Sequence, residues 1–239
     1  MTLQVVGLGA SGHARVVLEA LQFNESVRVV GLLDPNPQLH GSTVLGVPVL
    51  GGDELLPALR EDGISCFFVG LGSVGDCRPR MRLFELALKH GLNPVEVIHP
   101  RATVSPSAKL GKGVTILAGA VVNACAELGR NVILNTGAIV EHDCIVGDHV
   151  HIATGAELAS TVRVGSGVHV GAGATVRQCI QIGDWATVGA GAVVVKDVPP
   201  HATVVGVPAR PLCRRRPKAW RKANKQALES RRGTEHEVL

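Results

Sequence analysis

Aliphatic residues recur at every sixth position through the middle of this chain, without one interruption. All seventeen such positions are Val, Ile or Leu: Ile98, Val104, Leu110, Ile116, Val122, Leu128, Leu134, Val140, Val146, Ile152, Leu158, Val164, Val170, Val176, Ile182, Val188 and Val194. An α-helix cannot hold them on one face, because six residues make about 1.7 turns. A short strand followed by a turn can repeat with this period, so the pattern predicts a coil of parallel strands.

Three strands would complete one triangular coil of about 18 residues, and identical positions of successive coils would stack. Each aliphatic residue is expected to point to the axis of this prism. A small or aliphatic residue follows four positions later, as at Ala102, Ala120 and Ala138, and Gly often follows directly, as at Gly111 and Gly129. These residues suit narrow corners. A thin interior explains why only 3% of the residues are aromatic, with no Tyr and 29 Gly.

The first 95 residues have a different pattern, in which strands and helices alternate. We expect strands at 3–6, 27–33 and 64–69, and helices at 13–21, 55–60 and 78–90. The segment from Gly7 to Gly12 reads GxGxxG between the first strand and the first helix, and Asp34 ends the second strand. This context favours a phosphate at the helix N-terminus and a ribose hydroxyl at Asp34. A tight turn without a ligand is the alternative, and the region is half the size of a dinucleotide-binding fold.

The densest group of ionisable residues in the repeat region is Glu141-His142-Asp143, followed by Asp148, His149 and His151. The repeat predicts His142 in the middle of an outer face and His151 at a different corner, with His169 one coil beyond it. A carboxylate beside an imidazole is the arrangement of a general base. Two chemistries compete, acyl transfer by His142 and a divalent-metal site. The metal site would use His142, His149, His151 or His169, and a third histidine at a suitable spacing is not evident.

Cysteine usage and charge point to a cytoplasmic protein. The six cysteines, at positions 66, 77, 125, 144, 179 and 213, form no CxxC, so we expect free buried thiols. Neither a signal pattern nor an apolar run long enough for a membrane span occurs. Residues 1–209 carry a net charge of −3 and residues 210–239 a net charge of +7, so the basic character belongs to a tail. Trp220 stands alone there, which gives no support for nucleic-acid binding.

Several segments together resemble the NeuD/PglD-like family of sugar acetyltransferases, over roughly residues 2–212. They are the stretches 7–13, 32–34, 98–100, 134–136, 141–144 and 205–210. The resemblance implies a Rossmann-like α/β domain at 1–95 that holds a nucleotide-linked amino sugar. It implies a left-handed β-helix at 96–212, followed by a basic tail at 213–239. It also implies a homotrimer with acetyl-CoA between neighbouring prisms.

Matched position by position, the resemblance implies three groups of site residues. The base is His142, oriented by Asp143. The nucleotide sugar is held by Gly9, Ser11, Gly12, His13, Asp34 and Asn135. The acetyl-CoA site contains His151, Ser160, Ala172 and Ala190. Pro35 stands where the family often has a second acidic residue, which leaves the preference for base and sugar open.

The expected reaction is direct transfer of an acetyl group to the amine of a nucleotide-linked 4-amino-4,6-dideoxysugar. No Cys or Ser is paired with a base in a way that suggests an acyl-enzyme. We expect neither a metal nor a permanently bound cofactor, with acetyl-CoA as cosubstrate. The alternatives are O-acetylation of a sialic acid or related sugar, and a non-catalytic nucleotide-sugar scaffold. An NAD oxidoreductase is disfavoured by the half-sized nucleotide domain.

Overall fold

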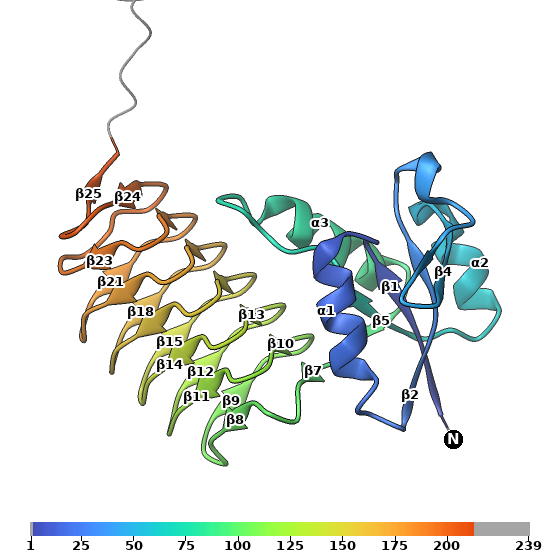
Figure 1. The fold of residues 1–239 in the computed structure, drawn as a ribbon, viewed down its shortest axis with the longest axis horizontal. Coiled ribbons are helices and arrows are strands. Elements are labelled where there is room, and N and C mark those ends of the chain that lie inside the picture. The colour runs from blue at the N-terminus through green and yellow to red at the C-terminus, as the bar shows by residue number, and fades with distance from the viewer. Residues whose placement is uncertain (1, 213–239) are drawn as a thin grey trace, which may run out of the picture.

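The computed structural model describes residues 2–212, which form an α/β region followed by a left-handed parallel β-helix (Figure 1). The chain leaves the α/β sheet after β6 (Asn93–Pro94) and enters the first coil at β7 (Val97–Ile98). Both predicted architectures are therefore confirmed. The basic tail at 213–239 lies outside the described residues.

The α/β region is built on a six-stranded sheet in the order β3-β4-β2-β1-β5-β6, parallel except for the hairpin of β3 and β4. Its other strands are β1 (Leu3–Leu8), β2 (Val27–Leu33), β3 (Thr43–Val44), β4 (Val47–Gly51) and β5 (Cys66–Val69). The hairpin is missing from the sequence expectation. Its turn uses Leu45 and Gly46, both at positive φ, the conformation of a two-residue hairpin turn.

Helices cover both faces of this sheet. Successive residues of a strand point to opposite faces, so neighbouring residues of β1 pack under different helices. Val5 packs into the core under α1 (Gly12–Leu21), whereas Val6 and Leu8 pack under α2 (Leu56–Glu61) and α3 (Arg78–Lys89). Short 3-10 turns occur at Pro37–Leu39 and Asp53–Leu55. The α1 core also includes Val97 and Leu117 of the first coils, so the two regions share buried surface.

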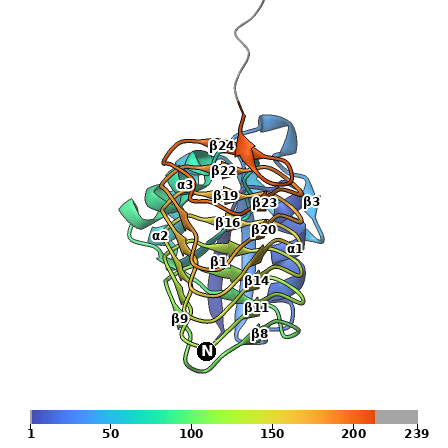
Figure 2. The same cartoon turned by 90° about the vertical axis from the view of Figure 1, so that its left-hand side faces the viewer.

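The β-helix has three walls of two-residue parallel strands. Figure 2 shows β22, β19 and β16 along one wall and β20, β14 and β11 along the next. The first wall contains β7, β10 (Thr115–Ile116), β13 (Ile133–Leu134), β16 (His151–Ile152), β19 (His169–Val170), β22 (Thr187–Val188), β24 (Thr203–Val205) and the antiparallel β25 (Arg210–Pro211).

The other two walls follow the same spacing. The second contains β8 (Thr103–Val104), β11 (Val121–Val122), β14 (Ile139–Val140), β17 (Glu157–Leu158), β20 (Thr175–Val176) and β23 (Val193–Val194). The third contains β9 (Lys109–Leu110), β12 (Glu127–Leu128), β15 (Ile145–Val146), β18 (Arg163–Val164) and β21 (Gln181–Ile182). Residues 18 apart pair, as Ile133 does with His151.

The aliphatic repeat fills the prism from Ile116 to Val194, where every member is buried. Val104 and Leu110 in the first coil are partly buried against this core. Ile98, the first member of the repeat, pairs in register with Ile116 but is 43% exposed, because it lies in the first coil, which has no coil beneath it.

Glycine at the corners is needed because backbones of adjacent coils approach closely. A Cβ at Gly147 would lie 2.9 Å from the carbonyl carbon of Gly165 in the next coil.

The expectation that the cysteines are free and buried is correct for only some of them. Cys66, Cys77 and Cys144 are free and buried, but Cys125 and Cys179 are exposed because both occupy turns, at positive φ. No helix among the described residues is long and apolar enough to span a membrane.

Candidate active site

The glycine-rich loop connects β1 to α1 with little room for side chains. Gly9 has φ +98, and a Cβ there would lie 3.3 Å from the backbone of Gly70. The Ser11 hydroxyl donates to the Gly70 carbonyl at 3.2 Å instead of capping α1. The N–H groups in the first turn of α1 are therefore left without a side-chain cap. Such a helix terminus attracts phosphate.

Asp34 follows β2 and is tied to the same loop. Its Oδ2 accepts from the Ala10 backbone N–H at 2.9 Å, and its Oδ1 accepts from the Asn36 N–H at 3.0 Å. Asp34 lines a pocket of about 450 Å³ with Gly9, Pro35 and, from α3, Arg82. The Asp34 carboxylate is thus held in one orientation at the edge of this cavity, next to the glycine-rich loop.

His142 and Asp143 form the turn between β14 and β15, at a corner of the prism. The expectation of a mid-face position is wrong, because the repeated aliphatic residue is the last residue of each strand and the turn follows two residues later. Asp143 Oδ2 lies 2.7 Å from His142 Nδ1, which fixes the proton on Nδ1 and leaves Nε2 as a free base. Asp143 has φ +59, a conformation that Asp tolerates better than most residues.

His151 lies on strand β16, not at a corner as expected from the sequence. It faces an open pocket of about 490 Å³ on the wall that contains β13, β16, β19 and β22. The predicted residues Asn135, Ala172 and Ala190 line this pocket as well, with Ser73 and His169. His169 pairs with His151 in register, which confirms the predicted stacking one coil apart.

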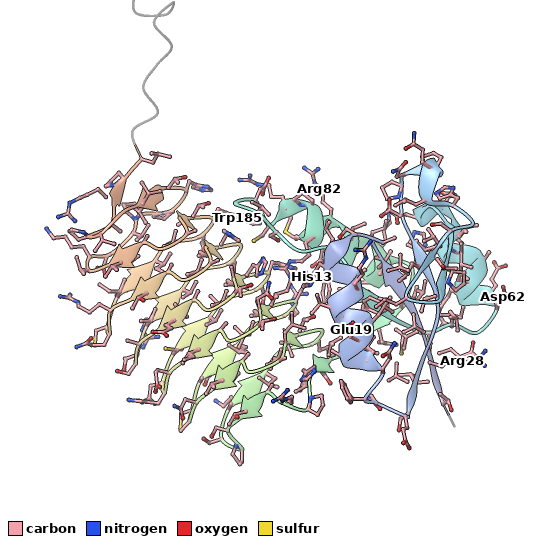
Figure 3. The ribbon with its side chains drawn as sticks, viewed as in Figure 1. His13, Glu19, Arg28, Asp62, Arg82 and Trp185 are labelled. Carbon is pink, nitrogen blue, oxygen red and sulfur yellow. The ribbon has the colours of Figure 1, made fainter. Side chains whose placement is uncertain are left out.

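The histidines around this pocket are held neutral. Burial, and after it the positive charge of Arg80, lower the pKa of His151 to about 3. Burial and then Arg80 likewise lower the pKa of His13 to about 4, and the pKa of His169 is lowered by the same two causes. Figure 3 shows His13 at the end of α1 that faces the β-helix, and its ring centroid lies 6.4 Å from that of His151.

The predicted site residues therefore fall into three places within one chain, of which the first is the glycine-rich loop with Asp34. Asn135, His151, Ala172 and Ala190 share the pocket, with His13 next to them. His142 and Asp143 lie at a corner of the prism, and the Thr161 N–H donates to the His142 carbonyl, which places the Ser160–Thr161 turn one coil above them. Ser160 is thus on the His142 corner and does not line the pocket.

His149 has a structural role and does not line the pocket. Its ring lies 3.0 Å from the Asn131 amide and packs edge-on against Phe84 at 5.8 Å. In the part of the chain from 2 to 212, no group of three His, Cys, Asp or Glu is arranged to hold a metal ion. The competing expectation of a metal site at His142, His149, His151 or His169 therefore finds no geometry to support it.

Two residues beside His151 are absent from the sequence expectation. Ser73 lies in the loop between β5 and α3, and its backbone N–H and carbonyl lie 3.2 and 3.0 Å from His151 Nδ1. Arg80 begins the buried face of α3 and contacts the Ser73 hydroxyl. Neither residue carries a motif or a spacing that marks it, because the contact of Ser73 with His151 joins positions 78 residues apart.

Family models match both regions of the chain. The PglD N-terminal domain matches residues 4–87, and bacterial transferase hexapeptide repeats match residues 125–160 and 161–196. Among curated proteins, none matches the chain.

Solved structures with the same two-region architecture are similar over nearly their whole length. PerB from Caulobacter crescentus, in complex with CoA and GDP-perosamine, is 44% identical, with 87% of this chain and 97% of that chain covered and a TM-score of 0.81. A variant of GDP-perosamine N-acetyl transferase from the same organism is 42% identical (87% and 96% covered, TM-score 0.82). The acetyltransferase domain of PglB from Neisseria gonorrhoeae, in complex with acetyl coenzyme A, is 39% identical (89% and 100% covered, TM-score 0.81).

Proposed function

Since this chain belongs to the NeuD/PglD-like family of hexapeptide-repeat acetyltransferases, we propose that it acetylates the amine of a nucleotide-linked 4-amino-4,6-dideoxysugar. Acetyl-CoA is the cosubstrate. The observation that carries the proposal is the His142–Asp143 pair at 2.7 Å, a ready general base, in a chain whose relatives hold CoA and a nucleotide-linked sugar.

The chemistry is a direct transfer. The sugar amine attacks the thioester carbonyl carbon, a C–N bond forms, and the C–S bond then breaks. His142 Nε2 takes the proton lost by the amine, while Asp143 stabilises the imidazolium that results. The CoA thiolate leaves and is protonated. Backbone N–H groups stabilise the oxyanion. Among residues 2–212, no Cys or Ser side chain hydrogen-bonds to an imidazole, which supports transfer without an acyl-enzyme.

The substrates are proposed to occupy the two cavities described above. The nucleotide would lie at the glycine-rich loop, with Gly9, Ser11, Gly12, His13 and Asp34, and Asn135 would lie near the acceptor. His151, Ala172 and Ala190 would contact acetyl-CoA from the pocket, and Ser160 from the corner above His142. The division of the chain at 1–95, 96–212 and 213–239 is part of this proposal.

We propose a homotrimer, and the separation of the two groups of residues supports assembly. The base lies at a corner of the prism and the pocket lies on the β13–β16 wall, so a neighbouring copy would bring the two together. We infer that His142 of one subunit faces the pocket of the next. A cytoplasmic enzyme of polysaccharide biosynthesis is the setting we propose.

The experiment is release of CoA thiol with a panel of GDP-, UDP- and dTDP-linked 4-amino-4,6-dideoxysugars, beginning with GDP-perosamine, which PerB holds, and with sialic acid as the hydroxyl acceptor. We expect an N-acetylated product by mass spectrometry. His142→Ala should lower kcat by about 10² to 10⁴-fold, and Asp143→Asn by about 10-fold, because the base is lost or loses its partner. The exposed turn residue His201, replaced by Asn, serves as the control with unchanged kcat.

Three outcomes would decide against the proposal. Near-normal turnover by His142→Ala would remove that residue from the mechanism. Acetylation of a sialic acid hydroxyl, with every amino sugar inert, would establish the O-acetyltransferase alternative, which uses the same base. Absence of thiol release with every acceptor, despite tight nucleotide-sugar binding, would leave the scaffold alternative.

A further inference from the structure

Arg80 is the largest fully buried side chain among the described residues. Its guanidinium has no carboxylate within ion-pairing distance in the part of the chain from 2 to 212. Burying an unpaired charge is costly, and a fold tolerates it only where every N–H group finds an acceptor. The buried, unpaired guanidinium of Arg80 contacts Ser73, which lines the pocket of His151, so its energetic cost indicates a role at this pocket.

All the acceptors of Arg80 are neutral oxygens, and they come from three parts of the molecule. Nη2 donates to the carbonyls of His149 at 2.6 Å and Val150 at 3.1 Å. Nη1 donates to the Asn131 carbonyl and, at 2.8 Å, to its side-chain Oδ1. Nε donates to the Ser73 hydroxyl at 3.3 Å. Asn131 and His149 occupy the same turn in successive coils, both at positive φ. One side chain therefore joins α3, two coils and the loop before α3.

That loop, residues 70–77, needs such anchors. It contains three glycines, and Gly75 has φ +74, so its backbone has wide conformational freedom. Besides the Arg80 bond, it is held by the Thr187 hydroxyl, which donates to the Gly75 carbonyl at 3.0 Å. The Cys77 thiol donates to the Val168 carbonyl. These anchors place Ser73 directly on His151.

The contacts of His151 define which ring nitrogen carries its proton. Asn135 Oδ1 accepts from the Thr136 N–H at 2.8 Å, so the Asn135 amide N–H is the group that faces His151 Nε2, at 3.2 Å. Nε2 therefore accepts and is unprotonated. The Ser73 N–H and the Ser73 carbonyl both face Nδ1, at 3.2 and 3.0 Å. Because Nε2 accepts from Asn135, the proton of the neutral ring lies on Nδ1 and is donated to the carbonyl. Asn135 thus sets the tautomer, and Ser73 holds the ring in its orientation in the pocket.

We propose that Arg80 is a positioning residue for the acetyl donor: through Ser73 it fixes His151 in the orientation that the thioester end of acetyl-CoA meets. The proposal rests on the donor site proposed above. The charge of Arg80 acts in the same direction as its hydrogen bonds. Within residues 2–212, the charged or titratable groups that act on His151 are this cation and two histidines, His13 from α1 and His169 from β19. A cation nearby disfavours a second charge, so His151 stays a neutral imidazole.

The test compares Arg80→Met and Arg80→Lys with the exposed helix residue variant Arg60→Met, which also removes one guanidinium. Long-range ¹H–¹⁵N spectra report the protonated nitrogen of His151, and calorimetry reports acetyl-CoA binding without any need for turnover. We expect Arg80→Met to lose the uniform Nδ1–H state and to weaken acetyl-CoA binding by about 10- to 100-fold. The KM for the nucleotide sugar should change much less. Arg80→Lys keeps the charge but not the fork of donors, and should restore only part of the affinity.

If Arg80→Met does not fold, Ser73→Ala tests the same link, because it removes only the hydroxyl that Arg80 contacts. It should weaken acetyl-CoA binding in the same direction, by a smaller factor. A folded Arg80→Met that keeps the Nδ1–H signal and normal acetyl-CoA affinity overturns the proposal. Equal losses for both substrates, with the His151 signal unchanged, also overturn it. A wild-type protein that binds acetyl-CoA but acetylates no sugar would refute the proposed function and leave the role of Arg80 supported by the binding data.

Discussion

Buried histidines are the residues that most strongly tie this fold to pH. His13 and His151 have pKa values of about 4 and 3 in the folded chain, mainly because of burial, against about 6.5 in an unfolded chain. Below about pH 6.5 the unfolded chain binds protons that the folded chain does not. The free energy of unfolding should therefore be highest above that pH and should fall as the pH drops towards about 4.

The predicted slope reaches at most about 1.4 kcal/mol per pH unit for each such histidine. Urea unfolding between pH 8 and pH 5 measures it. His13→Asn removes one of the titrating rings and should flatten the curve, whereas Val16→Ala, on the same helix, should shift stability equally at every pH. A wild-type stability that is the same at pH 5 and pH 8 would contradict this account.

At the level of the elements, α3 is the helix that joins the two regions. One of its faces presents Arg80 and Phe84 to the turns of the β-helix, and Glu85 lies 3.6 Å from His149 Nε2 at the edge of that contact. Phe84 also lies edge-on against Phe67 of β5, at 5.4 Å. The turn at Gly113 approaches this helix so closely that a Cβ there would lie 2.7 Å from Phe84 and 2.9 Å from Pro94.

A matched pair of glycines tests that contact. Gly113 and Gly119 both have φ +70, but around Gly119 nothing lies closer than 3.9 Å. Gly119→Ala should cost about 1 to 2 kcal/mol from backbone strain alone. Gly113→Ala should cost a further 1 to 3 kcal/mol or so, because it also overpacks the α3 contact. Urea unfolding of the two variants gives the difference. Equal losses would mean that α3 moves away from the turn without cost.

What the sequence could predict at this scale depends on whether contacts are local. The core from Ile116 to Val194 can be predicted from the repeat, because each strand pairs with the equivalent strand 18 residues away. The helices at α1 and α3 follow from local patterns in the same way. The Ser73–His151 and Arg80–His149 contacts join distant segments, so no local pattern marks them. The error at His142 has a different source, because the period fixes spacing but not which residue starts the turn.

For the whole molecule, the proposed function predicts assembly. His142 and Asp143 lie in the turn after β14, whereas the pocket with Asn135 and His151 is on the wall of β13 and β16. A base has to come within hydrogen-bonding reach of the amine it deprotonates. A rigid prism cannot bend one corner around to another wall, since its core is closely packed throughout. A closed ring of copies brings the corner of each to the wall of the next.

Mixed assemblies test this arrangement. In a trimer that contains both His142→Ala and His151→Ala chains, one of the three sites should combine an intact corner with an intact pocket. Two such inactive variants, co-expressed with different tags and purified on both, should therefore regain acetyl-CoA-dependent sugar acetylation. His142→Ala mixed with Asp143→Asn is the matched control, because both defects lie at the same corner and no site is restored beyond the activity that Asp143→Asn keeps alone. If the first mixture stays inactive while it assembles normally, the base and the pocket belong to one chain, and the inference of a site between subunits is wrong.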